Sequence, residues 1–164
     1  MLRRRLLLGV APAVLLAGCG FQLRQAPQLR FSTIALAGFG TRSPLAEELR
    51  RNIEASTTTH VVEASTQAQV VLEALGDVRE KSVVASTSAG QVRDFQLRLR
   101  FNFRLRNNSD RELIPPTEIQ QTRDLSYSES VALAKEQEEA FLYKSMQSDI
   151  VAQVMRRLAS IQTF

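Results

Sequence analysis

One stretch of the sequence limits the fold more than any other. In residues 95–106 apolar and polar residues alternate without interruption. The apolar positions are Phe95, Leu97, Leu99, Phe101, Phe103 and Leu105, and the polar positions are Gln96, Arg98, Arg100, Asn102, Arg104 and Arg106. Because successive side chains of a strand point to opposite faces, the pattern predicts a long β-strand with one apolar and one polar face.

The region before this strand predicts a strand, a helix and a second strand. Residues 31–36 and 57–62 are rich in β-forming residues, and Gly38 and Gly40 follow the first of these runs. Ser43 is placed to cap a helix with Pro44 at its first position. The apolar stripe of that helix is Leu45, Leu49 and Ile53. This order favours a right-handed crossover between parallel neighbours.

The remaining elements complete a sheet and its cover. An interrupted strand is predicted from residue 70 to about 84, and residues 112–126 can return antiparallel to the alternating strand, with Pro115 and Pro116 at a bulge or an edge. Residues 130–160 contain no proline or glycine and predict a long amphipathic helix. Its stripe is Leu142, Met146, Ile150, Val154 and Leu158. We expect an α+β two-layer sandwich, in which a mostly antiparallel mixed sheet of four to five strands carries two helices on one face.

The N-terminus has the pattern of a lipoprotein signal peptide in residues 1–18. Three arginines precede a short apolar run, which is too short for a permanent membrane span. The run ends in Leu16-Ala17-Gly18-Cys19, a lipobox, and Cys19 is the sole cysteine of the chain. We expect diacylglycerol and an N-acyl chain on Cys19, a lipidated tether over residues 19–28, and a single domain over residues 29–164. The alternative is an ordinary secreted protein whose cysteine happens to fall at this position.

Removal of the signal peptide changes what the charge implies. Of 21 Lys and Arg residues, the three signal arginines are lost, which leaves 18 against 17 acidic residues. The mature net charge of about +1 gives no argument for a nucleic-acid partner. Any cationic function must therefore depend on the local placement of basic residues.

The lipobox with the following residues 20–24, the strand-helix-strand start, the alternating strand and residues 132–135 opening a terminal helix together resemble the LptE family. The resemblance implies a non-enzymatic lipoprotein on the periplasmic side of the outer membrane, and Gly20 after the cysteine agrees with that destination. It further implies a plug inside the outer-membrane barrel LptD, assistance in the assembly of that barrel, and binding of lipopolysaccharide.

Two residues are candidates for lipopolysaccharide binding through this resemblance. Lys135 occupies the place where the family has basic residues near the start of its second helix. The alternative is an exposed helical lysine that pairs with Glu138 or Glu139. The family also has a basic residue before its central strand, but residues 86–91 contain none here, and Arg93 is the nearest substitute.

The polar face of the alternating strand offers a third candidate. Arg98, Arg100, Arg104 and Arg106 share that face, and guanidinium groups bind phosphate in a forked geometry. The alternative is a solvated or partner-facing surface in which arginine provides solubility and protects the sheet edge.

No catalytic or metal site is predicted. His60 is the single histidine, and the sequence contains no HExxH motif, no paired zinc ligands and no serine or cysteine nucleophile motif. Two other functions remain open: a lipoprotein subunit of a phospholipid-trafficking transporter, which should bind phospholipid, and an anchored hydrolase, which would need a reactive constellation that the sequence does not reveal.

Overall fold

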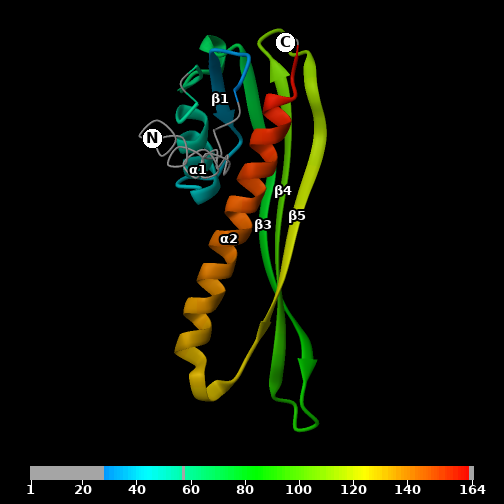
Figure 1. The fold of residues 1–164 in the computed structure, drawn as a ribbon. Helices are drawn as coiled ribbons and strands as arrows, with labels where there is room; N and C mark the ends of the chain where they lie inside the picture. Colours follow the sequence, from blue (N-terminus) through cyan, green and yellow to red (C-terminus); the bar gives the residue numbers. More distant parts are fainter. Residues whose placement is uncertain (1–27, 57, 163–164) are drawn as a thin grey trace, which may run out of the picture.

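A five-stranded mixed sheet with both helices on one face forms the body of the protein in the computed structural model, which describes residues 28–56 and 58–162 (Figure 1). The elements in chain order are β1 (Thr33–Ala37), α1 (Pro44–Glu54), β2 (His60–Val62), β3 (Val70–Ser86), β4 (Val92–Asn107), β5 (Glu112–Ser126) and α2 (Ala132–Ala159), with single 3-10 turns at Ser65–Gln67 and Glu129–Val131. The strand order is β2-β1-β3-β4-β5. The expected α+β architecture is confirmed.

The predicted strand-helix-strand start is present. β1 is parallel to β2 and to β3, whereas β4 is antiparallel to both of its neighbours, β3 and β5. Ser43 caps α1 as expected, because its hydroxyl oxygen accepts a hydrogen bond from the Ala46 N–H at 3.3 Å. β2 is shorter than predicted. Thr59, which precedes it, is buried, and its hydroxyl donates a hydrogen bond to the carbonyl oxygen of Phe31 at 2.7 Å. This threonine therefore anchors the loop before β2 and is not part of the strand.

β3 is one continuous strand, although its sequence does not alternate regularly. The register to β4 shifts between Ala74 and Gly76, where β3 has a bulge. Leu72 and Ala74 lie opposite Leu105 and Phe103 before the bulge, and Asp77 lies opposite Phe101 after it. The bulge therefore exchanges the even-numbered and odd-numbered residues between the two faces of the sheet.

The apolar face of β4 forms the centre of the core. Phe101 is fully buried and stacks on Phe103, with ring centroids 5.3 Å apart, and on Phe39 at 5.8 Å. The helices cover this face with their predicted stripes, of which Leu45, Leu49, Ile53, Met146, Ile150, Val154 and Leu158 are buried and Leu142 is partly buried. Pro115 and Pro116 lie in the edge strand β5, between register shifts, as the sequence predicts.

The two ends of the molecule differ in thickness. β1, β2 and α1 lie only in the upper half of the molecule, whereas β3, β4, β5 and α2 extend through both halves (Figure 1). We call the far end the narrow end; it consists of the turn between β3 and β4, residues 87–91, and the connection from β5 to α2, residues 127–131.

The predicted signal peptide, Cys19 and most of the predicted tether lie outside the described residues. Within the described ranges, neither helix combines the length and the apolar character that a membrane crossing requires. Leu29 and Phe31, close to the first described residue, are buried in the core.

Candidate functional site

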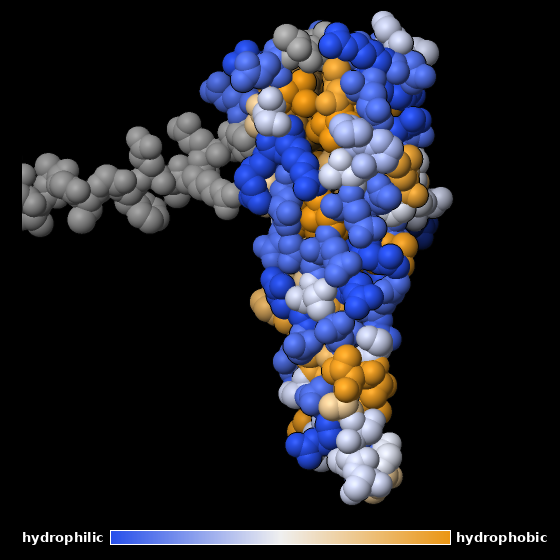
Figure 2. Space-filling view, turned by 90° about the vertical axis from the view of Figure 1, so that its right-hand side faces the viewer, coloured by the Kyte–Doolittle hydropathy of each residue, from blue (hydrophilic) through white to orange (hydrophobic). Residues whose placement is uncertain are grey.

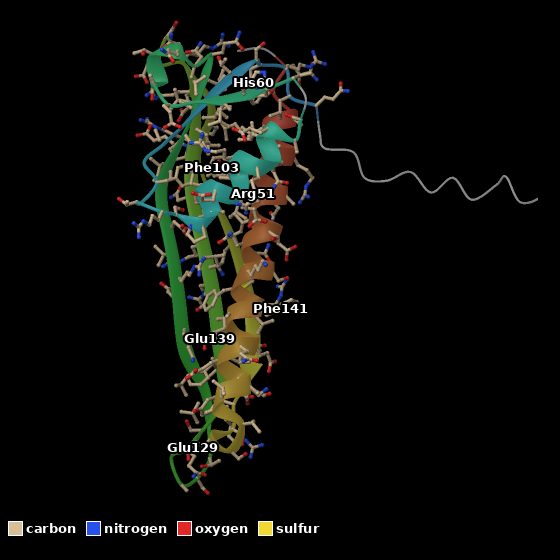
Figure 3. All side chains as sticks on the ribbon, turned by 90° about the vertical axis from the view of Figure 1, so that its left-hand side faces the viewer. Arg51, His60, Phe103, Glu129, Glu139 and Phe141 are labelled. Carbon is tan, nitrogen blue, oxygen red and sulfur yellow. The ribbon has the colours of Figure 1, made fainter. Side chains whose placement is uncertain are left out.

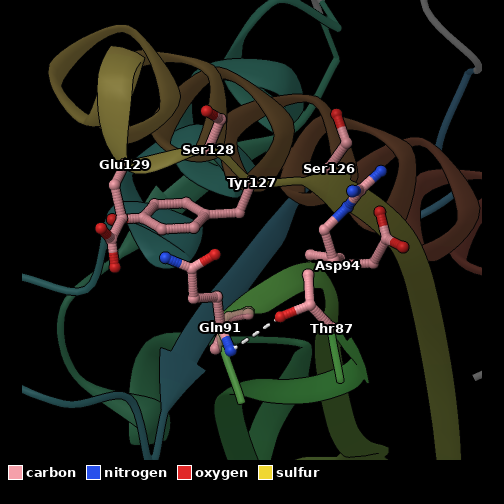
Figure 4. A pocket seen from close by; sticks show the side chains of 9 residues that line it. Thr87, Gln91, Asp94, Ser126, Tyr127, Ser128 and Glu129 are labelled. Atoms are coloured by element: carbon pink, nitrogen blue, oxygen red, sulfur yellow. Dashed lines mark hydrogen bonds between the residues drawn. The ribbon is translucent and has the colours of Figure 1, made fainter. Parts of the chain in front are cut away.

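The narrow end contains a cavity between two segments that are far apart in the sequence. Its volume is about 420 Å³. The lining residues are Thr87, Gln91, Val92, Arg93, Asp94, Ser126, Tyr127, Ser128 and Glu129 (Figure 4). The Gln91 N–H donates to the Thr87 hydroxyl at 3.1 Å, which closes the turn, and the Tyr127 N–H donates to the carbonyl oxygen of Arg93 at 2.6 Å. The first hydrogen bond stabilises the turn between β3 and β4. The second joins the start of β4 to the β5–α2 connection.

Arg93 and Lys135, the two candidates for lipopolysaccharide binding, both lie at this end: Arg93 lines the cavity, and Lys135 contacts Ser126, which also lines it. Ser126 pairs in register with Asp94, beside Arg93, and its hydroxyl accepts a hydrogen bond from the Lys135 Nζ at 3.1 Å. Lys135 also pairs with Glu138 at 2.8 Å, which is the helical pairing considered above. The Lys135 side chain is 19% exposed. Arg93 is exposed and forms no ion pair with any described residue.

Apolar side chains are exposed next to these cations. Leu133, in the first turn of α2, is 71% exposed. Val83 and Val84 near the end of β3 and Val131 before α2 are also exposed, and the surface view shows an apolar patch toward this end (Figure 2). Sequence reasoning missed these residues. Leu133 could have been found, because it lies off the predicted apolar stripe of its helix.

The arginines on the polar face of β4 share the sheet face that the helices leave open, but they are paired. Glu80 on β3 binds Arg98 at 3.4 Å and Arg100 at 2.5 Å. Glu73 on β3 binds Arg104 at 2.7 Å and lies 3.8 Å from Arg106, which also contacts Asp110 at 3.4 Å. The hydrogen bond and the charge of Glu73 raise the pKa of Arg104. The face is therefore a lattice of ion pairs with an excess of arginine, and a role in anion binding stays a prediction.

Asp77 on β3 predicts a pH effect on stability. Partial burial raises the pKa of its carboxyl group, and the nearby Arg79 opposes the shift only in part. A carboxyl group whose pKa is raised on folding binds its proton more tightly in the folded state, so stability falls as the pH rises above the unfolded value and through the folded pKa. We expect Asp77→Asn to be more stable than the parent at pH 7, with the difference vanishing near pH 3.

Urea denaturation at both pH values measures this difference. Glu54→Gln, at the exposed end of α1, removes the same charge at another position and is the control variant. A variant Asp77→Asn that is less stable than the parent at pH 7 would show that attraction to Arg79 outweighs burial.

His60 is exposed on β2. Among the described residues, no group of three or more His, Cys, Asp or Glu side chains is arranged to hold a metal ion.

The fold and the sequence match known proteins along most of the chain. The family model for LptE, described as lipopolysaccharide-assembly, matches residues 31–158. A lipoprotein B from Nitrosomonas europaea is 33% identical, with a TM-score of 0.73 over 86% of this chain and 91% of its own.

Two further solved structures share the fold. The rare lipoprotein B from Shewanella oneidensis is 22% identical, with a TM-score of 0.67 over 79% of this chain and 95% of its own. A minor lipoprotein from Acinetobacter baumannii is 15% identical, with a TM-score of 0.64 over 80% of this chain and 93% of its own. The family match over residues 31–158, together with the identity to the first of these structures, shows that the chain belongs to the LptE family of lipopolysaccharide-assembly lipoproteins.

Proposed function

We propose that this chain is a non-enzymatic lipoprotein of the outer membrane, anchored through acyl chains on Cys19, that forms a plug in the barrel LptD, assists the assembly of that barrel and binds lipopolysaccharide at its narrow end. Family membership supports the general role. The observation that carries the lipid site is the placement of Arg93 of β4 and Lys135 of α2 at the same end of the molecule, with exposed apolar side chains nearby.

The chemistry of the narrow end suits an amphiphile that carries phosphate groups. Ammonium and guanidinium groups form charge-assisted hydrogen bonds to phosphate. Contact between the neighbouring apolar side chains and acyl chains removes both from water, which favours binding. Lys135 is held by Ser126 and Glu138, so it is positioned before a ligand arrives. A phosphate must then compete with Glu138 for this ammonium group.

The helix-free sheet face supports the proposed plug. Its arginines are half-exposed and share two glutamates. Burying these charged groups against an apolar surface would cost free energy, so the face suits contact with water or with a polar protein surface. The lumen of an outer-membrane barrel is polar. A polar sheet face packed against that lumen needs no apolar interface.

Reversal of both narrow-end cations should weaken lipopolysaccharide binding. In the double variant Arg93→Asp and Lys135→Asp, two charge-assisted contacts of roughly 1.5–3 kcal/mol each become repulsive. We expect the dissociation constant for purified lipopolysaccharide to rise at least about ten-fold, since each factor of ten corresponds to about 1.4 kcal/mol. The fold should persist, because an aspartate in the first turn of α2 interacts well with the helix dipole.

Arg111→Asp is the matched control. Arg111 is exposed in the turn between β4 and β5, at the opposite end of the sheet, and should leave lipopolysaccharide binding unchanged. The control changes the net charge by two units and the double variant by four. A loss of binding free energy for the control that is half the loss for the double variant would therefore reduce the effect to net charge and contradict a site at the narrow end.

A detergent pull-down of the lipidated chain separates the proposed function from its rivals. Mass spectrometry of the captured material should identify a large β-barrel and lipopolysaccharide, and both the control and the double variant should retain the barrel. Capture of phospholipid with transporter subunits would favour the phospholipid-trafficking alternative and overturn the plug.

A further inference from the structure

Most of β3 has a free edge. β1 pairs only with Val70 to Glu73, at the beginning of the strand. No other strand of the described chain pairs with this side of β3, so no strand covers the edge from Leu75 to Ser86. One carbonyl oxygen in this stretch, that of Glu80, accepts a hydrogen bond from the Tyr143 hydroxyl of α2 at 2.7 Å. At about 3.3 Å per residue, the free edge is roughly 35–40 Å long. Along it, the N–H and C=O groups of alternate residues face away from β4.

The other sheet edges are protected in ways that this one is not. β2 has three residues, and β5 contains Pro115 and Pro116 and lies against α2 through the 2.9 Å ion pair between Arg123 and Asp149. A lysine often guards an exposed edge. Lys81 does not, because its ammonium group lies over the sheet, 2.6 Å from Glu139 and 4.2 Å from the centre of the Phe95 ring.

The same stretch of β3 exposes apolar side chains. Four of the seven large apolar side chains that are exposed in the described part of the chain lie on it: Leu75, Val78, Val83 and Val84. Leu75 and Val78 line a shallow cavity on the helix-free face, together with Asn102 of β4. A strand added to this edge would cover them with its own side chains.

On the helix side, a groove runs alongside the free edge. Its upper part has a volume of about 680 Å³ and lies between α1, α2 and Arg79 of β3. A second cavity of about 460 Å³ shares Arg79 and Ala140 with it, is also lined by Glu136, Glu139 and Tyr143, and continues toward the narrow end. The positive charge of the groove is therefore confined to its upper part. Figure 3 looks at this side of the molecule, with Arg51 on α1 above Glu139 and Phe141 on α2. Alternate side chains of a strand next to β3 would enter the groove.

The upper groove is cationic. Four basic side chains line it against two acidic ones: Arg42, Arg51, Arg79 and Lys144 against Glu47 and Glu48. Glu48 already accepts hydrogen bonds from Gln147 and Ser148 at 2.6 Å each. Neither Arg42 nor Lys144 has an ion pair within the described ranges. An acidic side chain entering from an added strand would therefore find unpaired cations.

We propose that the free edge of β3 binds an extended segment of a partner protein, which adds to the sheet as a further strand. The segment alternates acidic and apolar residues where it passes the upper groove: the acidic side chains enter that groove beside Arg79 and Lys144, and the apolar ones cover Leu75 and Val78. Main-chain hydrogen bonds provide affinity and the alternate side chains provide specificity, as in other cases of strand addition. The lower end of this edge adjoins the lipid site at the narrow end, because Val83 and Val84 belong to both surfaces.

A synthetic decapeptide of alternating glutamate and valine tests the proposal on the mature chain in detergent micelles. Fluorescence anisotropy should detect its binding, and the lysine-valine counterpart should bind at least five-fold more weakly. The double variant Arg51→Glu and Lys144→Glu should weaken binding of the glutamate peptide by a similar factor. Arg111→Glu changes an exposed arginine away from the groove and should have no effect.

Hydrogen exchange distinguishes strand addition from attraction of charges. Bound peptide should slow exchange at alternate amides between Asp77 and Val83. Two methylated peptides, one with N-methyl groups on the odd-numbered amides and one on the even-numbered amides, define two frames. The frame that methylates the amides facing β3 should abolish binding, and the other frame should be tolerated. Binding without new protection in β3, or binding that is indifferent to both frames, would overturn the proposal. Concentration-dependent dimers that protect the same amides without peptide would also overturn it, since a second copy would then occupy the edge.

Discussion

Replacing Phe101 with alanine is expected to lower the free energy of unfolding by about 3–5 kcal/mol. The side chain is fully buried between Phe39 and Phe103, and it belongs to the central apolar row of β4. Truncation removes the apolar burial and both ring contacts, and it leaves a cavity between the sheet and the helices. The cavity cannot close readily, because the β4 backbone is paired on both sides. Chemical denaturation of the parent and the variant measures the loss.

Phe141→Ala is the matched control for Phe101→Ala. The same atoms are removed from a side chain on α2 that is 70% exposed, so we expect a change within about 0.5 kcal/mol. A loss below about 1 kcal/mol for Phe101→Ala would show that the helices do not pack closely on this row. A large loss for Phe141→Ala would show that α2 has a partner surface in the preparation that was measured.

The elements that the sequence predicted well are those whose pattern is local. The alternation in β4, the cap at Ser43 and the stripe of α2 each depend on neighbours within one strand or one helix, and the structure confirms them. The irregular sequence of β3 hid its full length, because the bulge between Ala74 and Gly76 reverses its faces. That bulge arises from pairing with β4, which single-strand periodicity does not encode.

The candidate site was predictable in parts for the same reason. Helical spacing alone predicted a pair of Lys135 with Glu138 or Glu139, and the structure contains the pair with Glu138. The placement of Lys135 at the same end as Arg93 depends on the register that places Ser126 opposite Asp94, which only the folded sheet determines. The pairing of Arg104 with Glu73 likewise joins residues 31 positions apart. Sequence therefore identified the arginine face but not the glutamates that neutralise much of it.

The exit from β1 gives the second large prediction. Gly38 has a φ of +74°, a backbone conformation that residues with a side chain rarely adopt. An added Cβ would lie closer to the carbonyl oxygen of Ala74 than van der Waals contact allows. The segments that contain Gly38 and Ala74 are both held in place, because Ala37 pairs with Glu73 and Phe39 stacks on Phe101. The backbone strain and the clash should together cost about 2–4 kcal/mol, so Gly38→Ala should lower the urea midpoint of unfolding clearly.

Two other glycines separate the two causes of this loss. Gly90 has a φ of +80° but open space around it, so Gly90→Ala should cost only about 1–2 kcal/mol from the backbone. Gly40 has open space and an ordinary φ, and Gly40→Ala should be neutral or slightly stabilising. If Gly38→Ala costs no more than Gly90→Ala, the carbonyl of Ala74 must be free to move, and the bulge that begins the free edge of β3 would be soft instead of fixed.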